Sequence, residues 1–284
     1  MAELTNITVL GTGVLGSQIA YQSAFHGKTV VAYDISEDAL EQAKARFAGL
    51  AETYVAEVPG ATAESTAAAV ARIRLSADLA DAVKDADLVI EAVPEHPSIK
   101  RDTYERLGAV APEKTVFATN SSTLLPSDLM AYTGRPEKFL ALHFANRVWR
   151  MNTAEVMGTE QTDPAVYADV VGFATSIGMV PIEIKKEKAG YVLNSLLVPL
   201  LSAASGLLVD GIADPETIDK TWRIGTGAPM GPFQIYDVVG LTTAYNISSM
   251  GDATQQRFAA YLKEHFIDQG KLGVATGEGF YSYR

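Results

Sequence analysis

The chain has 284 residues, a length that suits two domains, and its 48% hydrophobic and 20% charged residues exclude a disordered chain. It contains no cysteine, which excludes disulfides, zinc–thiolate sites and a cysteine nucleophile, and we expect no metal site. Its 23 basic and 34 acidic residues give a net charge of −11, so neither nucleic acid nor a membrane surface is an expected partner.

The segment that follows the first few residues argues against a targeting signal. The N-terminus carries no basic region, and the apolar stretch after it is interrupted by Gly11 and Gly13. The longest other candidate for a membrane span, residues 192–209, is interrupted by polar residues and by Pro199. We therefore expect a cytoplasmic protein that acts on a small molecule.

The first two-thirds of the chain alternates short apolar runs with longer alanine-rich segments, which is typical of parallel strands joined by helices. Strands are expected at 7–10, 29–33, 72–75, 88–92, 115–118, 139–142, 155–157 and 179–183, and helices at 15–25, 37–58, 64–71, 99–110 and 164–176. The alternation stops after a charged cluster at 185–188, and the rest of the chain has a helical pattern. This predicts an α/β fold: a doubly wound, Rossmann-type domain at 1–185, followed by an all-helical domain at 186–284.

A glycine-rich turn joins the first predicted strand to the first predicted helix. Gly11-Thr12-Gly13-Val14-Leu15-Gly16 has the spacing in which glycines permit a tight turn and a close approach of the backbone to a pyrophosphate. Asp34 ends the second predicted strand, 18 residues after Gly16, where an acidic residue meets the ribose of NAD. The alternative for Asp34 is the N-cap of the following helix. Because strand, glycines and acid coincide, we expect an NAD site that includes the turn and Asp34.

One of the four histidines has the position of an acid–base catalyst. His26, His96 and His265 lie at a helix end, in a loop and on a late helix. His143 ends a buried run at the carboxyl end of a strand, where open α/β sheets bind their ligands. A histidine at such a place also occurs for structural reasons alone.

Seven segments together carry a resemblance to one family. They are Gly11–Gly16, Val89-Ile90-Glu91-Ala92-Val93-Pro94-Glu95, Ala118-Thr119-Asn120-Ser121-Ser122, Leu142-His143-Phe144-Ala145-Asn146, Gly190-Tyr191-Val192-Leu193-Asn194, Pro229-Met230-Gly231-Pro232 and Thr276-Gly277-Glu278-Gly279-Phe280-Tyr281. In this order and at this spacing, the sequence resembles the L-3-hydroxyacyl-CoA dehydrogenases, including the bacterial 3-hydroxybutyryl-CoA dehydrogenases of fatty acid metabolism, almost from end to end.

The resemblance implies a role for four polar residues in catalysis. His143 resembles the family's base and Glu155 its carboxylate partner, which would hold the imidazole and stabilise its charged form. Ser122 resembles the serine that hydrogen-bonds the reacting oxygen, although the adjacent Ser121 is an alternative, and either is otherwise a turn serine. Asn194 resembles the asparagine that completes the polar site.

The resemblance also implies three further cofactor contacts beside Gly11, Gly13, Val14, Leu15, Gly16 and Asp34. These are Glu95, Lys100 and Asn146. For Lys100, an exposed helix lysine is the alternative interpretation, since only its spacing from Glu95 supports a contact with NAD.

The sequence departs from the family at positions that bear on the substrate. The family carries lysines for the CoA phosphates on the helix after the second strand, whereas residues 48–58 contain Glu52 and Glu57 and no basic residue. Missing basic contacts remove much of the binding field for a CoA ester. Either Arg147, Arg150 or Lys188 compensates for them, or the substrate is a smaller hydroxy acid.

The expected function is an NAD-dependent oxidoreductase that interconverts a short L-3-hydroxyacyl-CoA and its 3-ketoacyl-CoA. One alternative is the same chemistry on a non-CoA 3-hydroxy acid such as a sugar acid. A second is a non-catalytic, crystallin-like protein that has kept the NAD site. Residues 191–209 are apolar on more than one helical face, so we also expect a homodimer through the helical domain, the alternative being a central helix of a monomer.

Overall fold

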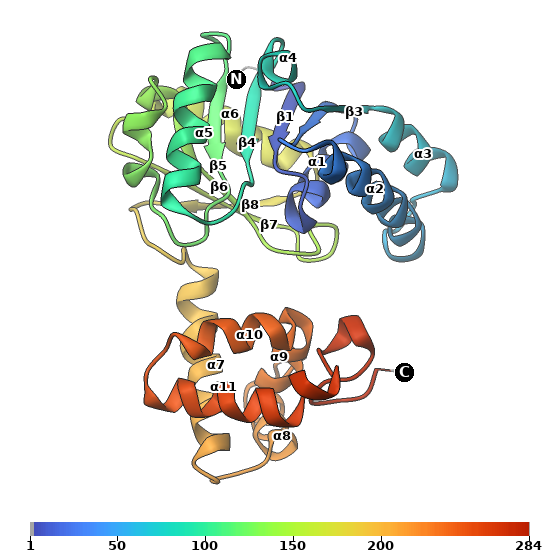
Figure 1. Ribbon diagram of the computed structural model, residues 1–284, viewed down its shortest axis with the longest axis vertical. Helices are drawn as coiled ribbons and strands as arrows, with labels where there is room; N and C mark the ends of the chain where they lie inside the picture. Colours follow the sequence, from blue (N-terminus) through green and yellow to red (C-terminus); the bar gives the residue numbers. More distant parts are fainter. Residues whose placement is uncertain (1–2, 284) are drawn as a thin grey trace. The chain divides into compact units, whose positions relative to one another are not determined.

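The computed structural model describes residues 3–283, which form two compact units (Figure 1). The first unit ends at Val192 and the second begins at Leu193, seven residues beyond the boundary expected at 185. Two contacts keep the intervening segment with the first unit. The Ser127 amide donates to Glu187 Oε1 at 2.8 Å, and the Lys188 amide donates to the sulfur of Met157 at 3.2 Å.

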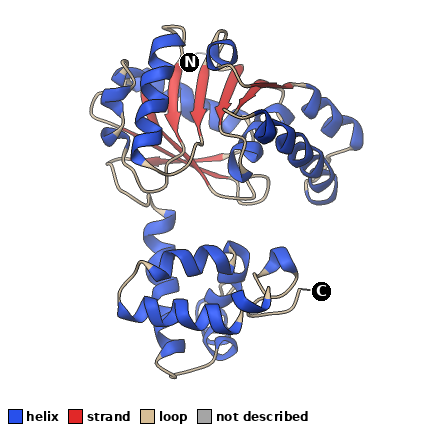
Figure 2. Cartoon of the chain, in the orientation of Figure 1, coloured by secondary structure: helices blue, strands red, loops and turns tan. Residues whose placement is uncertain are grey.

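A single sheet of eight strands organises the first unit (Figure 2). The strands are β1 (Asn6–Leu10), β2 (Thr29–Tyr33), β3 (Ile73–Ser76), β4 (Leu88–Glu91), β5 (Val116–Thr119), β6 (Phe139–Phe144), β7 (Thr153–Gly158) and β8 (Val180–Ile184). Their order across the sheet is β3-β2-β1-β4-β5-β6-β7-β8. The order reverses between β1 and β4, and such a switch point is where open α/β sheets bind ligands.

Helices cover both faces of this sheet, which confirms the doubly wound fold. They are α1 (Val14–Phe25), α2 (Glu37–Glu57), α3 (Ala63–Ala71), α4 (Leu79–Val83), α5 (Pro97–Val110) and α6 (Pro164–Ser176), with short 3₁₀ helices at Pro126–Asp128, Met130–Tyr132 and Pro136–Lys138. The helices and the sheet pack through two hydrophobic cores. One contains Phe47 and Phe173, and the other contains Tyr104 and Phe139. Helix α4 was not expected because five residues are too short to show a helical period.

One strand pair departs from the expected parallel order. Strands β6 and β7 are antiparallel, because the loop between them, residues 145–152, is too short for the crossover that parallel strands need. The resulting register places His143 directly opposite Glu155. Side chains opposite each other in such a pair share one face of the sheet, so the turn between the strands brings this histidine and this carboxylate together.

The second unit is helical around its own hydrophobic core. It contains α7 (Leu193–Val209), α8 (Pro215–Thr226), α9 (Pro232–Val239), α10 (Leu241–Ser249), α11 (Ala253–His265) and 3₁₀ helices at Ile267–Gln269 and Val274–Thr276. Phe233, Leu241 and Phe258 are fully buried in its core. Within residues 3–283, no helix is long and apolar enough to cross a membrane, and the cytoplasmic location stays a prediction.

Candidate active site

Two positions of the glycine-rich turn after β1 accept only glycine for steric reasons. Gly11 has φ +96°, and a Cβ there would lie 2.6 Å from the Ala92 carbonyl oxygen, while a Cβ on Gly16 would lie 2.0 Å from the Gly11 oxygen. A Cβ on Gly13 would meet nothing within 4 Å, so the turn leaves open space at that residue. The backbone therefore packs tightly against β4 and leaves room on its outer side.

A cavity of about 510 Å³ opens beside this turn. It is lined by residues of the turn, of the ends of β2 and β4, and of α4 and α5: Gly11, Gly13, Tyr33, Asp34, Ile35, Leu79, Ala92, Val93, Pro94, Ile99, Asp102, Thr103 and Arg106. Helix α1 begins here with Gly13 as an N-cap that has no side-chain capping bond, and its first turn contains no acidic residue. Its free N–H groups and positive dipole end suit a pyrophosphate, and the cavity therefore fits a dinucleotide.

Asp34 lines this cavity, and its carboxylate is held in place by the glycine-rich turn. The Thr12 backbone amide and hydroxyl donate to Asp34 Oδ2 at 2.9 and 2.8 Å. The N-cap of α2 is Ser36, whose side chain accepts from the Ala39 amide at 3.3 Å, so the alternative role of Asp34 as N-cap is wrong. A fixed carboxylate at the end of β2 suits the 2′-hydroxyl of an NAD ribose.

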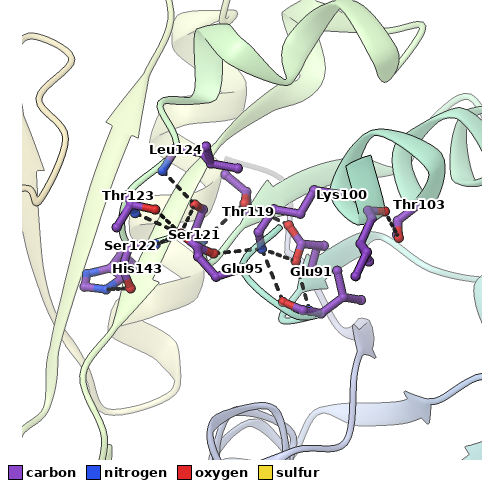
Figure 3. A network of polar contacts seen from close by, with 12 residues as sticks. Glu91, Glu95, Lys100, Thr103, Thr119, Ser121, Ser122, Thr123, Leu124 and His143 are labelled. Atoms are coloured by element: carbon purple, nitrogen blue, oxygen red, sulfur yellow. Dashed lines mark hydrogen bonds and ion pairs between the residues drawn. The ribbon is translucent and has the colours of Figure 1, made fainter. Parts of the chain in front are cut away.

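His143 and Glu155 form a buried pair whose other end reaches Ser122. His143 Nδ1 and Glu155 Oε2 are 2.9 Å apart, and both residues are at most 5% exposed. Ser122 Oγ lies 3.2 Å from His143 Nε2 (Figure 3). The second oxygen of Glu155 accepts from the Val192 amide at 2.9 Å. A carboxylate that orients an imidazole, whose far nitrogen faces a hydroxyl, is an arrangement suited to moving a proton to or from a bound oxygen.

Tyr191 supports this histidine and was missed by the sequence analysis. Its ring stacks on the His143 imidazole, with centroids 4.4 Å apart and planes at 14°. Its hydroxyl donates to the Ser121 carbonyl at 2.7 Å, and its φ of +52° is unusual for a non-glycine residue. The signal was present in the segment Gly190-Tyr191-Val192, but no sequence pattern indicates which ring an aromatic residue will contact.

The two adjacent serines have different surroundings. Ser121 is fully buried, donates its hydroxyl to Glu95 Oε1 and accepts from the Leu124 amide at 3.0 Å, so it holds the loop. Ser122 presents its hydroxyl to His143. The geometry thus favours Ser122 over Ser121 for contact with a reacting oxygen.

Lys100 lies in the interior, where it pairs with two carboxylates. Its ammonium is 2.6 Å from Glu91 Oε1 and 3.2 Å from Glu95 Oε2, and its side chain is 1% exposed. The alternative of an exposed helix lysine is therefore wrong, and a direct contact of Lys100 with the cofactor stays a prediction. Glu91 was missed as a site residue, although an acidic residue that ends an otherwise apolar strand was a visible signal.

Two predicted site residues take part in none of the contacts given above. Asn146 is exposed in the loop that follows β6. Asn194 lies in the first turn of α7, in the second unit. Their contacts with cofactor and substrate stay predictions.

The loop after β6 is tied to the end of α2. Arg147 donates to both oxygens of Glu57, at 3.2 and 2.9 Å, and the Trp149 indole donates to Glu57 Oε2 at 2.9 Å. The hydrogen bonds from Trp149 and Arg147 lower the pKa of Glu57, so it stays a carboxylate. Arg147 also has φ +63°, and its amide donates to Gln18 Oε1 at 2.7 Å. Arg147 is therefore neutralised within this contact, while the charge of Arg150 nearby also lowers the pKa of Glu57.

A doubly wound sheet that accepts a dinucleotide at its switch point and presents a histidine–carboxylate pair at the same edge defines a nicotinamide-dependent dehydrogenase. Residues 6–188 match the model of the 3-hydroxyacyl-CoA dehydrogenase NAD binding domain, and residues 190–283 match that of the C-terminal domain. The chain belongs to the 3-hydroxyacyl-CoA dehydrogenase family, and its cofactor is NAD. It is thus an oxidoreductase, which argues against the non-catalytic alternative.

Relatives within this family differ in substrate. The mitochondrial hydroxyacyl-coenzyme A dehydrogenase of Sus scrofa is 36% identical over 98% of this chain and 91% of its own length. A 5-formyl-3-hydroxy-2-methylpyridine 4-carboxylate 5-dehydrogenase of Mesorhizobium japonicum is 34% identical over 99% of this chain and 91% of its own length. The solved structure of a diketoreductase that acts on dicarbonyl compounds is 72% identical to this chain. The match covers 100% of both chains and has a TM-score of 0.96.

Proposed function

We propose that this enzyme uses NADH to reduce small β-dicarbonyl compounds, which carry no CoA, to the corresponding 3-hydroxy compounds. The observation that carries this choice is the contact of Glu57 with Arg147 and Trp149. This contact places a carboxylate at the end of α2 and pairs it with Arg147, so one of the cations that were expected to compensate for the absent lysines is already neutralised. The diketoreductase at 72% identity supports the same substrate class.

The charges along α2 support this substrate class further. The helix carries Lys44 and Arg46 as its basic residues; Lys44 pairs with Glu41, and Arg46 donates to the Thr12 carbonyl and to Gln42. A CoA ester carries several phosphate charges and needs unpaired cations to bind them. Helix α2 therefore offers the phosphates of a CoA ester little electrostatic attraction. A neutral dicarbonyl substrate has no phosphates and does not need such cations.

The residues of the first unit account for the proton in this reaction. Bound NADH supplies the hydride. The His143 imidazolium donates a proton to the carbonyl oxygen as it becomes a hydroxyl, and the Ser122 hydroxyl hydrogen-bonds the same oxygen. Glu155 stabilises the charged imidazole through Nδ1. In the oxidative direction, His143 takes the proton back.

The substrate class is tested by following NADH oxidation with a β-diketone, a 3-keto ester, free 3-keto acids and acetoacetyl-CoA. We expect kcat/KM for the neutral dicarbonyl compounds to exceed that for acetoacetyl-CoA at least about tenfold, the factor that corresponds to about 1.4 kcal/mol of binding in the transition state. A preference for acetoacetyl-CoA would restore the CoA ester as substrate. A preference for free 3-keto acids would restore the hydroxy acid alternative.

The role of Glu57 is tested by Glu57→Gln, which frees Arg147. We expect KM for acetoacetyl-CoA to fall several-fold, on the order of one arginine–phosphate contact, while the constants for a neutral diketone change little. Glu64→Gln, which removes an exposed acid from α3, is the matched control and leaves both substrates unaffected. An unchanged KM for the CoA ester in Glu57→Gln would show that Glu57 does not determine the substrate.

We also infer that the enzyme forms a homodimer through its second unit. Leu193, Leu196, Val198 and Leu207 of α7 are each at least 39% exposed, and apolar residues gathered on one helix indicate a surface that a partner covers. Twofold pairing of identical chains is the commonest closed assembly. Light scattering is expected to give about twice the chain mass, and Leu196→Glu is expected to lower it. A mass of one chain for the unmodified protein at low concentration would contradict the dimer.

A further inference from the structure

A buried ion pair lies at the end of β4, beneath the loop that carries Ser122. Glu91 and Lys100 are 0% and 1% exposed, and Glu91 Oε1 is 2.6 Å from the ammonium. Glu91 also accepts hydrogen bonds from the Tyr104 hydroxyl at 3.2 Å, the Thr119 hydroxyl at 2.9 Å and the Val93 amide at 2.9 Å. A buried ion pair is retained only where its geometry and hydrogen bonds offset desolvation, so the ammonium of Lys100 has a defined position.

From this position, Lys100 reaches a second carboxylate that is partly exposed. Its Nζ lies 3.2 Å from Glu95 Oε2, and the Glu95 side chain is 37% exposed. Burial acts to raise the pKa of Glu95, but the hydrogen bond from Ser121, the charge of Lys100 and the hydrogen bonds from Thr123 together outweigh it and lower that pKa to about 2. Glu95 is therefore ionised at every pH at which the protein is assayed.

The other oxygen of Glu95 accepts hydrogen bonds from the loop formed by residues 121–123, which carries Ser122. Glu95 Oε1 accepts from the Ser121 hydroxyl at 2.5 Å, the Ser122 amide at 2.9 Å, and the Thr123 amide and hydroxyl at 2.9 and 2.8 Å. One ionised oxygen thus holds three consecutive residues, and hydrogen bonds to a charged acceptor are about twice as strong as neutral ones. Figure 3 shows Glu91, Lys100 and Glu95 leading to this loop and to His143.

We propose that Lys100 is a positioning residue: held by Glu91, it holds Glu95, and Glu95 fixes the loop that presents the Ser122 hydroxyl to His143. The chain of contacts ends at the Ser122 Oγ to His143 Nε2 distance of 3.2 Å. This inference rests on the dehydrogenase activity and is independent of the substrate class. It also differs from a direct contact of Lys100 with NAD, which would alter cofactor binding rather than the chemical step.

The test is the double variant Glu91→Gln/Lys100→Met, which removes both buried charges together and so avoids leaving an unpaired ion in the interior. Reduction is measured with the substrate that the unmodified enzyme turns over fastest, so that a wrong substrate class does not affect the result. We expect kcat to fall about tenfold, as for a misplaced hydrogen-bond donor, with the KM for NADH little changed. Lys84→Met, which breaks an exposed ion pair with Asp81, is the control and keeps full activity.

The pH profile separates positioning from a merely structural effect. Without the charge of Lys100, the pKa of Glu95 rises, because burial still raises it while only the hydrogen bonds from Ser121 and Thr123 lower it, so Glu95 becomes protonated at a higher pH than in the unmodified enzyme. The double variant is then expected to lose activity on the acid side when ketone reduction is measured. The unmodified enzyme, whose Glu95 pKa is about 2, is expected to lack this loss.

A second variant keeps the test decisive if the double variant does not fold. Glu95→Gln leaves the Glu91–Lys100 pair intact and places an uncharged acceptor under the loop, so we expect a lower kcat with no new acid-side loss. Full kcat in whichever variant folds would overturn the proposal, and so would an unchanged pH profile in the double variant. A raised KM for NADH at unchanged kcat in the double variant would also overturn it, in favour of a direct cofactor contact.

Discussion

His143→Gln is expected to lower kcat at least about a hundredfold, the usual effect of losing a general acid–base group. Glutamine retains a polar side chain for Glu155 but has no group that exchanges a proton near neutral pH. His143 packs between Glu155 and Tyr191, and glutamine keeps a polar side chain at this place, so the melting temperature is expected to change little. Steady-state kinetics and circular dichroism measure both quantities on the same preparation.

Two further variants test whether the loss of kcat in His143→Gln comes from the loss of the acid–base group. His96→Gln replaces an exposed histidine at the start of α5 and is expected to keep full activity. Glu155→Gln is expected to have a milder effect than His143→Gln, because it leaves the base in place and removes only the charge beside it. Near-native turnover in His143→Gln would mean that another group transfers the proton.

The second large effect concerns the cofactor: kcat/KM with NADH is expected to exceed that with NADPH about a hundredfold, a factor that corresponds to roughly 2.7 kcal/mol. The carboxylate of Asp34 is held by two hydrogen bonds from Thr12 and cannot easily turn away from a 2′-phosphate. Two like charges at about 4 Å repel by about 4 kcal/mol near a protein surface, and solvent screens part of that.

Asp34→Ala is expected to weaken NADH binding and to reduce this preference, since it removes both the ribose acceptor and the repulsion. Asp38→Ala, which removes an exposed acid from the first turn of α2, is the matched control and is expected to preserve the preference. Equal efficiency of the unmodified enzyme with NADH and NADPH would refute the assignment of Asp34.

Much of the fold was predictable because its signals are local. Strand β2 begins and ends at the predicted residues, and the other predicted strands fall within a few residues of their observed ends. Asp163 caps α6 by accepting from the Ala165 amide at 2.7 Å, as its position before Pro164 indicates. Apolar runs, caps and glycines act within a few residues of themselves, so a single sequence contains them.

By itself, the sequence determined the doubly wound fold and predicted the dinucleotide turn and His143 as a candidate base, because glycine spacing and strand ends reflect local backbone geometry. The family resemblance implied that Glu155 is the partner of His143. Only the tertiary structure showed how these two side chains meet and which residues contact Tyr191 and Lys100. The antiparallel register of β6 and β7 sets His143 against Glu155, the stacking of Tyr191 joins residues 48 positions apart, and Lys100 turns out to be buried between Glu91 and Glu95. Such contacts depend on how whole elements pack, and no period or spacing along one chain records which face of a helix meets which strand end.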